Sequence, residues 1–300
     1  MSTNSITQAR VDRRSSGGRW AFSPLGNCRR ALFSARRLPR SGAALSLLVV
    51  ERPSADPEHG FGDPLAADAD GVVALGGPMD PARLLAAYAR GIFPWSGDPV
   101  RWCSPDPRAI FYRIRLPRKL GKMMRRGDFR VTFDQDFDAV ISGCAESHRD
   151  DGEWITDAFV EAYSELHRHG YAHSVEVWQA GRLVGGLYGV QLNGLFAGES
   201  MFTRVDNASK VGFAHLVWHL ATIGTVLFDC QMLTPLTHAL GAVYVHRSDY
   251  LYLLDEAMEV QTAFSGERWP AAGAPGVAER SAATRQRKST KTSGNGEADR

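Results

Sequence analysis

Apolar and polar residues alternate along three consecutive segments near the middle of the chain. The segments are HSVEVW (173–178), LVGGLYGVQL (183–192) and NGLFAGESMF (193–202). A side-chain period of two is typical of β-strands. The Asn193-Gly194 pair at the start of the last segment is a strong signal for a hairpin turn. The pattern therefore predicts three antiparallel strands in a meander.

Elsewhere the apolar residues recur every three or four positions, which predicts amphipathic helices. Capping residues at the start and glycines at the end mark their limits. The expected helices run from Asp80 to Gly91, from Thr156 to Gly170, over 207–223, and from a cap at Ser248 or Asp249 through Leu254.

The stretch 91–108 is rich in proline and tryptophan and has neither period. It predicts a rigid, irregular connector instead of a strand or a helix, with a domain boundary near Asp106. Both ends of the chain differ from its middle in composition and are expected to be disordered. The predicted units are a basic N-terminal arm (1–45), a small N-terminal domain (46–106), a larger domain (107–265) and a C-terminal tail (266–300).

The segment VLFDCQML (226–233) is an apolar strand pattern with two polar interruptions. Asp229 and Gln231 are two positions apart, so both side chains are expected on one face of the strand. Glu199 is another acid in an otherwise apolar strand. The three residues fit either a buried structural network or a reaction site, and the spacing alone leaves both interpretations open.

The chain has 300 residues, of which 44% are hydrophobic, and a formal net charge of +2, as expected for an ordinary globular protein. It contains no run of about 18 apolar residues, so no membrane helix is expected. Four widely separated cysteines with no paired metal-ligand spacing predict reduced thiols in the cytoplasm and no metal site. One stretch is locally basic, and its cations are Arg113, Arg115, Arg118, Lys119, Lys122, Arg125, Arg126 and Arg130. It fits either a solvated helix face or a surface that binds nucleic-acid phosphates.

The predicted order is three meandering strands, a helix, a strand and a helix. This order indicates an α+β fold in which helices pack on a mostly antiparallel sheet. It is also the order of N-acetyltransferase-type enzymes. The segment VGGLYG is glycine-rich, but it lies within a strand pattern and not between a strand and a helix. It is therefore not expected to form a phosphate-binding loop.

Eight motifs occur in a fixed order between about residues 70 and 255: LGG…DPARLLAAYARGIFPW, SPDPRAIF, WIT, AHSVEVW, LVGGLYGV, GESMF, NASKV and DCQ. Together they resemble the leucyl/phenylalanyl-tRNA-protein transferase family. The resemblance implies a C-terminal domain similar to the acyl-CoA N-acyltransferase (GNAT-type) fold, preceded by a small N-terminal α+β domain. It also implies transfer of Leu or Phe, and less readily Met, from aminoacyl-tRNA to an N-terminal Arg or Lys of an acceptor protein, which marks that protein for degradation. No cofactor, metal or membrane is implied, and the enzyme is expected to act as a monomer in the cytoplasm.

The resemblance also implies roles for individual residues. Asp229 and Gln231 of DCQ would form the reaction centre, with Glu199 of GES beside them. Trp95 and Trp154 would contact the 3′-terminal adenosine of the tRNA, and the basic stretch would lie along the acceptor stem. The pocket for the transferred side chain would be lined by Leu187, Phe196, Leu216, Leu220 and Phe228.

Three positions depart from the family pattern. Cys103 stands where the family usually has a second Trp, Leu236 where it has a His, and Ala239 where it has a Ser; His238 is a candidate substitute for the missing His. Two other functions fit part of the sequence. An acetyl-CoA-dependent N-acetyltransferase would share the fold but needs a pyrophosphate-binding turn that the sequence lacks. A non-catalytic tRNA-binding protein would need no polar trio.

Overall fold

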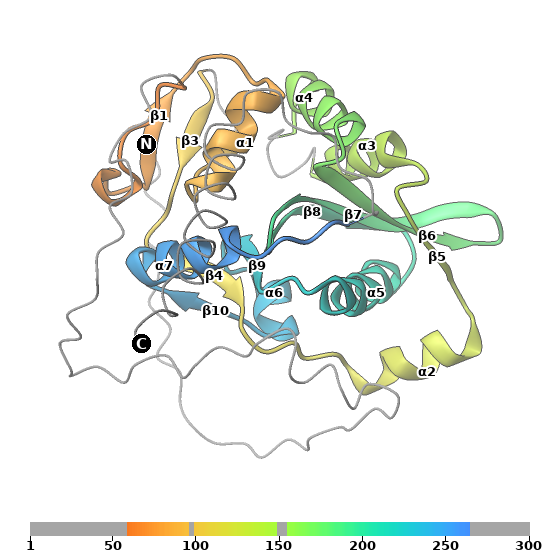
Figure 1. The fold of residues 1–300 in the computed structure, drawn as a ribbon. Coiled ribbons are helices and arrows are strands. Elements are labelled where there is room, and N and C mark those ends of the chain that lie inside the picture. The colour runs from red at the N-terminus through yellow and green to blue at the C-terminus, as the bar shows by residue number, and fades with distance from the viewer. Residues whose placement is uncertain (1–58, 96–98, 149–154, 265–300) are drawn as a thin grey trace, which may run out of the picture.

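The computed structural model describes residues 59–95, 99–148 and 155–264. The predicted basic arm, the tail and Trp154 lie outside these residues. Within them, the chain builds one large mixed sheet, one small sheet and the helices that cover them (Figure 1). The α+β class predicted from the sequence is confirmed.

The large sheet has seven strands in the order β10-β4-β9-β8-β7-β6-β5. Its centre is the predicted meander, β6 (Ala172–Gln179), β7 (Arg182–Leu192) and β8 (Leu195–Thr203), which is confirmed. The predicted strand 226–233 is β9 (Leu227–Gln231), and it pairs with β8 in parallel and with β4 antiparallel. The remaining strands are β4 (Arg108–Phe111), β5 (Arg130–Phe133) and β10 (Ala242–Val245), and all their pairings are antiparallel.

The prediction of an irregular connector at 91–108 is wrong. β2 (Phe93–Trp95) and β3 (Arg101–Cys103) pair with each other, and β1 (Val72–Leu75) joins them in a three-stranded sheet of order β1-β3-β2. Pro94 lies in the edge strand β2, where a missing backbone donor is tolerated. The proline pattern therefore indicated breaks between strands but not the strands themselves.

The predicted helices are present. α1 (Pro81–Ala89) begins with the Asp80 carboxylate accepting a hydrogen bond from the Arg83 amide, and Gly91 follows its end with a φ of +76°. α4 is Asp157–Arg168 with Thr156 as its N-cap, and α5 is Ala208–Ile223 with Gly224 as its C-cap. α7 is Arg247–Met258, and its N-cap, His246, lies two or three residues before the predicted caps Ser248 and Asp249.

Four further helical elements complete the order: the 3-10 helix η1 (Pro64–Ala66), α2 (Arg118–Arg126), α3 (Phe137–Ser147) and α6 (Pro235–Leu240). α2 places part of the basic stretch on a helix, as the helix-face interpretation required. Among the described helices, none combines the length and the apolar composition needed to span a bilayer.

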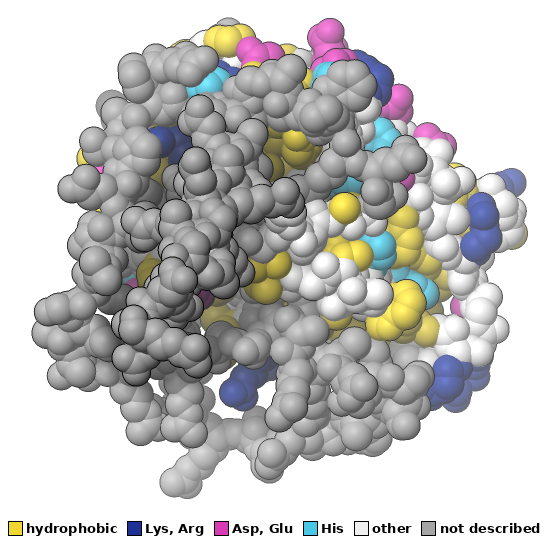
Figure 2. All heavy atoms as spheres, viewed as in Figure 1, with side chains coloured by type: hydrophobic (Ala, Val, Ile, Leu, Met, Phe, Trp, Pro, Cys, Tyr) yellow, Lys and Arg dark blue, Asp and Glu magenta, His cyan; other side chains and the backbone are white. Residues whose placement is uncertain are grey.

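The two faces of the large sheet bury separate apolar clusters, because successive side chains of a strand point to opposite faces. Tyr188 and Ala197 belong to the cluster that also contains α1, α3 and α4 residues. Their neighbours Leu187 and Phe196 belong to the cluster on the α5 face. In Figure 2, hydrophobic and histidine side chains gather over the region of α5, whose Trp218 is half exposed.

Gly185 of VGGLYG lets α5 approach β7 closely. A Cβ atom added at Gly185 would lie 2.8 Å from the Ala208 Cβ and 3.1 Å from the Ser209 amide nitrogen. The segment lies inside β7, as the argument against a phosphate-binding loop expected.

We expect Gly185→Ala to lower the free energy of unfolding by about 1 to 3 kcal/mol, because the added methyl group would push α5 away from the sheet. Urea denaturation followed by circular dichroism measures the change. Gly62→Ala is the matched control, since the nearest atom to its added Cβ is 3.8 Å away. Equal stability of the two variants would contradict this account of the glycine.

Candidate active site

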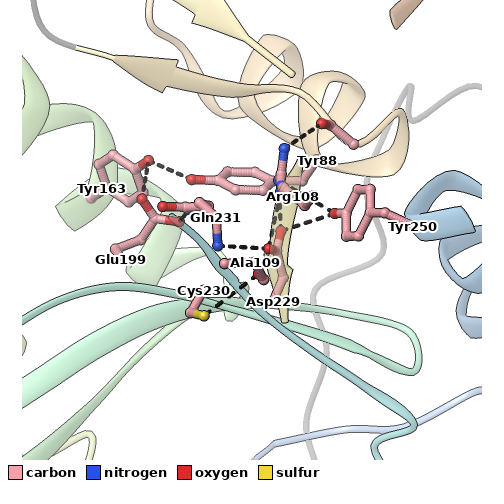
Figure 3. A network of polar contacts seen from close by, with 10 residues as sticks. Tyr88, Arg108, Ala109, Tyr163, Glu199, Asp229, Cys230, Gln231 and Tyr250 are labelled. Atoms are coloured by element: carbon pink, nitrogen blue, oxygen red, sulfur yellow. Dashed lines mark hydrogen bonds and ion pairs between the residues drawn. The ribbon is translucent and has the colours of Figure 1, made fainter. Parts of the chain in front are cut away.

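β8 and β9 form the only parallel pair among the described strands, and they pair over only part of their length. They pair from Leu195 and Leu227 as far as Ala197 and Asp229. Beyond that point β8 and β9 are not paired with each other, and Glu199 and Gln231 stand on these unpaired ends; we call this place the opening between β8 and β9. The Gln231 amide bridges the opening, because its Nε2 donates to Glu199 Oε1 over 2.7 Å (Figure 3).

A β-bulge lies on each side of this opening. On β8, Tyr188 pairs with Ser200 and Gly189 with Gly198, so Glu199 is the extra residue. On β9, the register with β4 shifts so that Cys230 is the extra residue, and Gln231 has a φ of +61°. Bulges redirect side chains and are common near active sites. The pair of bulges turns the carboxylate and the amide toward each other.

Asp229 is fully buried and makes four hydrogen bonds. Its Oδ1 accepts from Arg108 Nε at 3.0 Å and from the Gln231 backbone amide at 2.8 Å. Its Oδ2 accepts from Arg108 Nη2 at 2.6 Å and from the Tyr250 hydroxyl at 2.9 Å. A carboxylate offers about four acceptor positions, so these bonds saturate it. Asp229 therefore holds the backbone of Gln231 in place.

Arg108 is the partner of Asp229 that the sequence analysis missed. It is 1% exposed, its Nη1 donates to the Gly91 carbonyl at 2.9 Å, and its guanidinium stacks on the Phe93 and Tyr250 rings. Burial alone would lower the pKa of Arg108, but the Asp229 carboxylate outweighs this effect and raises it. The signal in the sequence was an arginine that opens the apolar strand RAIF, since a charge is rarely buried without a partner.

Glu199 also contacts two buried tyrosines that the sequence analysis missed. Tyr163 donates to Glu199 Oε2 at 3.2 Å, and the Tyr88 and Tyr163 hydroxyls lie 2.5 Å apart (Figure 3). Burial raises the pKa of Glu199 to about 7; hydrogen bonds from Tyr88, Gln231 and Tyr163 counteract part of the shift, and the charge of Asp229 adds to it. Burial and the Glu199 charge raise the pKa of both tyrosines, so they remain hydroxyl donors.

The Gln231 side chain is oriented but not saturated. Its Nε2 is committed to Glu199, while no group in the described part of the chain donates to its Oε1. The Gln231 backbone is anchored, and the side-chain nitrogen is already bonded to Glu199. The side-chain oxygen Oε1 can therefore accept a hydrogen bond from a bound amine.

The five residues predicted for the side-chain pocket lie together, but on the other face of the sheet from Glu199. Each is at most 4% exposed and belongs to the cluster against α5: Leu187, Phe196, Leu216, Leu220 and Phe228. The opening between β8 and β9 lies between the two faces.

The predicted RNA-contacting residues are spread more widely. Trp95 is half-buried at the end of β2, where its ring contacts Phe93. The basic stretch surrounds and includes α2, and its exposed cations are Arg113, Arg115, Lys119, Lys122, Arg125, Arg126 and Arg130. Arg118 begins α2. The described coordinates hold no group of three His, Cys, Asp or Glu residues arranged to bind a metal.

The three departures from the family pattern lie in different surroundings. Cys103 is buried in β3 opposite Phe93. Leu236 is half-buried and Ala239 exposed in α6, and His238 is exposed in the last turn of that helix.

Comparison with known proteins gives a consistent result. The sequence model of the family described as "Leucyl/phenylalanyl-tRNA protein transferase" matches residues 110–255, and the model of its N-terminal domain matches residues 77–106. Proteins named leucyl/phenylalanyl-tRNA–protein transferase from Pseudomonas fluorescens (strain Pf0-1) and Chromohalobacter salexigens are 55% and 48% identical to this chain. The first alignment covers 61% of this chain and 85% of the relative, and the second covers 72% and 83%.

A solved structure of a conserved protein of unknown function from Staphylococcus epidermidis is also similar, with a TM-score of 0.32 and 9% identity. That alignment covers 58% of this chain and 68% of the other.

We expect Arg108→Met to lower the free energy of unfolding by about 3 to 5 kcal/mol, because it leaves the Asp229 carboxylate buried without its cation. Thermal or urea denaturation measures the loss. Arg204→Met is the matched control, since Arg204 pairs with Glu146 at the surface and such pairs contribute about 1 kcal/mol or less. A similar loss in both variants would contradict the role of the buried pair.

Glu199 should make stability depend on pH. Its folded pKa of about 7 lies above the ordinary value of 4.5, so between these pH values the folded state binds more protons than the unfolded state. Stability relative to Glu199→Gln should therefore be greatest below pH 4.5 and fall as the pH rises through 7, by roughly 1 to 3 kcal/mol. Denaturation of both proteins at pH 5 and pH 8 tests this; a difference that grows with pH in favour of the wild type would contradict it.

Proposed function

This chain belongs to the leucyl/phenylalanyl-tRNA protein transferase family and is an aminoacyltransferase; on that premise we propose which groups it transfers and which residues do so. The transferred groups are leucyl and phenylalanyl, and less readily methionyl, carried by tRNA. The acceptor is an N-terminal Arg or Lys of a protein, which is thereby marked for degradation in the cytoplasm. Neither alternative from the sequence, acetyl-CoA chemistry or tRNA binding without catalysis, agrees with the name shared by the relatives.

The observation that carries this proposal is the Gln231 to Glu199 contact across the opening between β8 and β9. A substrate whose reacting ester lies in this opening can direct its apolar side chain toward the α5 face. Its adenosine then remains on the other face, on which β2 and Trp95 lie. In this arrangement the bound substrate would join the predicted apolar and polar parts of the site.

The proposed reaction depends more on the orientation of the two reactants than on chemical activation of either one. An aminoacyl ester is already activated, so attack by an α-amine forms the peptide bond and breaks the ester bond without ATP, metal or coenzyme. The tRNA 3′-oxygen leaves as a hydroxyl group, which takes up the proton that the amine loses. Alignment of the two reactants can supply about 7 to 11 kcal/mol of barrier reduction in well-oriented systems. The free acceptor amine has a pKa of about 7.7 to 8.0, so a useful fraction is neutral near pH 7.

In this mechanism Gln231 is the catalytic residue that orients the amine. Its Oε1 accepts a hydrogen bond from the amine and stabilises the positive charge that develops there. Glu199, with a pKa of about 7, is suited to take the proton that the amine loses. Asp229 acts through Gln231 as a positioning residue, because its own acceptor positions are occupied.

The tRNA would be held by two further features. Trp95 and Trp154 would stack on the terminal adenosine, a mode by which proteins hold single-stranded bases. The exposed cations around α2 would contact backbone phosphates, which fixes position without reading sequence. The site is complete within one chain in this arrangement, so a monomer suffices.

We expect Gln231→Ala to lower kcat for transfer of labelled Leu from leucyl-tRNA to a peptide beginning with Arg by about 10² to 10³-fold, with little change in KM for the tRNA. The lost interaction is made as charge develops, and so it affects kcat more than binding. Gln179→Ala, at an exposed glutamine on β6, is the control and should retain full activity. Undiminished transfer by Gln231→Ala would exclude the proposed centre.

A further inference from the structure

Phe264 lies at the end of the described chain and is buried between rings from three strands and a helix. It is 5% exposed. Its ring stacks on His173 of β6 with centroids 4.1 Å apart and on Phe196 of β8 at 5.9 Å. Phe133 of β5 and His219 of α5 contact it from other sides, at 5.9 Å and 4.4 Å. The nine residues from 256 to 264 lie outside the matched segment, which ends at residue 255.

Hydrogen bonds hold the segment that carries Phe264. In Figure 1 the chain leaves α7 as a blue segment that crosses β9 in this view on its way to the meander. Gln191 Nε2 donates to the Thr262 hydroxyl at 2.6 Å, and the Thr262 hydroxyl donates to the Asn193 carbonyl. Asn193 Nδ2 donates to the Met258 carbonyl at 2.7 Å, and His219 Nε2 donates to the Phe264 carbonyl at 2.9 Å. These hydrogen bonds and the ring contacts therefore hold the Phe264 side chain in place.

Phe264 shares its apolar cluster with all five residues that the family resemblance assigns to the side-chain pocket. A transferred side chain that enters this cluster from the opening between β8 and β9 passes Phe228 and Phe196, which contact each other edge to face at 5.4 Å. Phe196 is in turn stacked on Phe264. The ring of Phe264 thus stands on the side of Phe196 away from β9.

We propose that Phe264 forms the inner wall of the part of this apolar cluster that receives the transferred side chain, and that it limits the length of side chain the enzyme accepts. This inference rests on the proposed function. A wall made of a fixed aromatic ring discriminates by shape, because a longer side chain cannot displace a ring packed on four sides. Truncation of the wall should admit longer side chains at little cost to shorter ones.

The test compares transfer from leucyl-, phenylalanyl- and tryptophanyl-tRNA to a peptide beginning with Arg. For Phe264→Ala we expect the kcat/KM ratio of tryptophanyl to leucyl transfer to rise tenfold or more, the size of effect typical of a pocket enlarged by one or more methylene groups. Phe264→Leu should give a smaller rise. Phe264→Trp should lower the ratio of phenylalanyl to leucyl transfer.

Phe61→Ala is the matched control, because Phe61 is 2% exposed and packs on Trp102 of the small sheet. It removes the same side chain from another cluster and should leave both ratios unchanged. Unchanged ratios in Phe264→Leu and Phe264→Trp would overturn the proposal even if Phe264→Ala does not fold. Absence of leucyl transfer by the wild type would instead overturn the proposed function, so the two failures are distinguishable.

Discussion

Arg108 and Asp229 are 121 residues apart in the chain and meet as an ion pair whose side chains are each 1% exposed. Burial of two charges is costly and is offset here by bidentate geometry and by partners for the remaining polar atoms. The Gly91 carbonyl takes one further guanidinium donor, and Tyr250 of α7 donates to the carboxylate. The pair therefore joins α1, β4, β9 and α7 at one point.

This pair fixes the geometry of the opening between β8 and β9. Asp229 is the last residue of β9 that pairs with β8, and its carboxylate holds the backbone amide of Gln231, whose φ is positive. A non-glycine residue persists in such a backbone conformation only when its surroundings impose it. The strained glutamine and the bulged Glu199 then meet across the opening. In the proposed mechanism, Asp229 positions Gln231 and does not itself accept a proton, because its acceptor positions are occupied.

The two faces of the large sheet carry different parts of the proposed site. The face toward α1 and α4 carries Glu199 and the hydroxyl groups around it, and burial raises the pKa of Glu199 to about 7. The face toward α5 carries the apolar side chains and Phe264. The point at which the pairing of β8 with β9 ends lies between the two faces. The α+β class is confirmed, while the N-acyltransferase-type fold that the family resemblance implies stays a prediction.

Local patterns in the sequence determined the meander, helices α1, α4 and α5, and the strand that carries Asp229 and Gln231, because periodicity and caps act over a few residues. They also identified Glu199 as a candidate site residue, since an acid in an apolar strand requires a partner. The partners themselves, Arg108, Tyr163 and Tyr250, come from distant segments, and no local pattern assigns them. Strands β2 and β3 were missed because tertiary pairing overrode a proline-rich composition. The bulges, and the face on which each group lies, were decided only by the register between strands, which depends on contacts across the whole sheet.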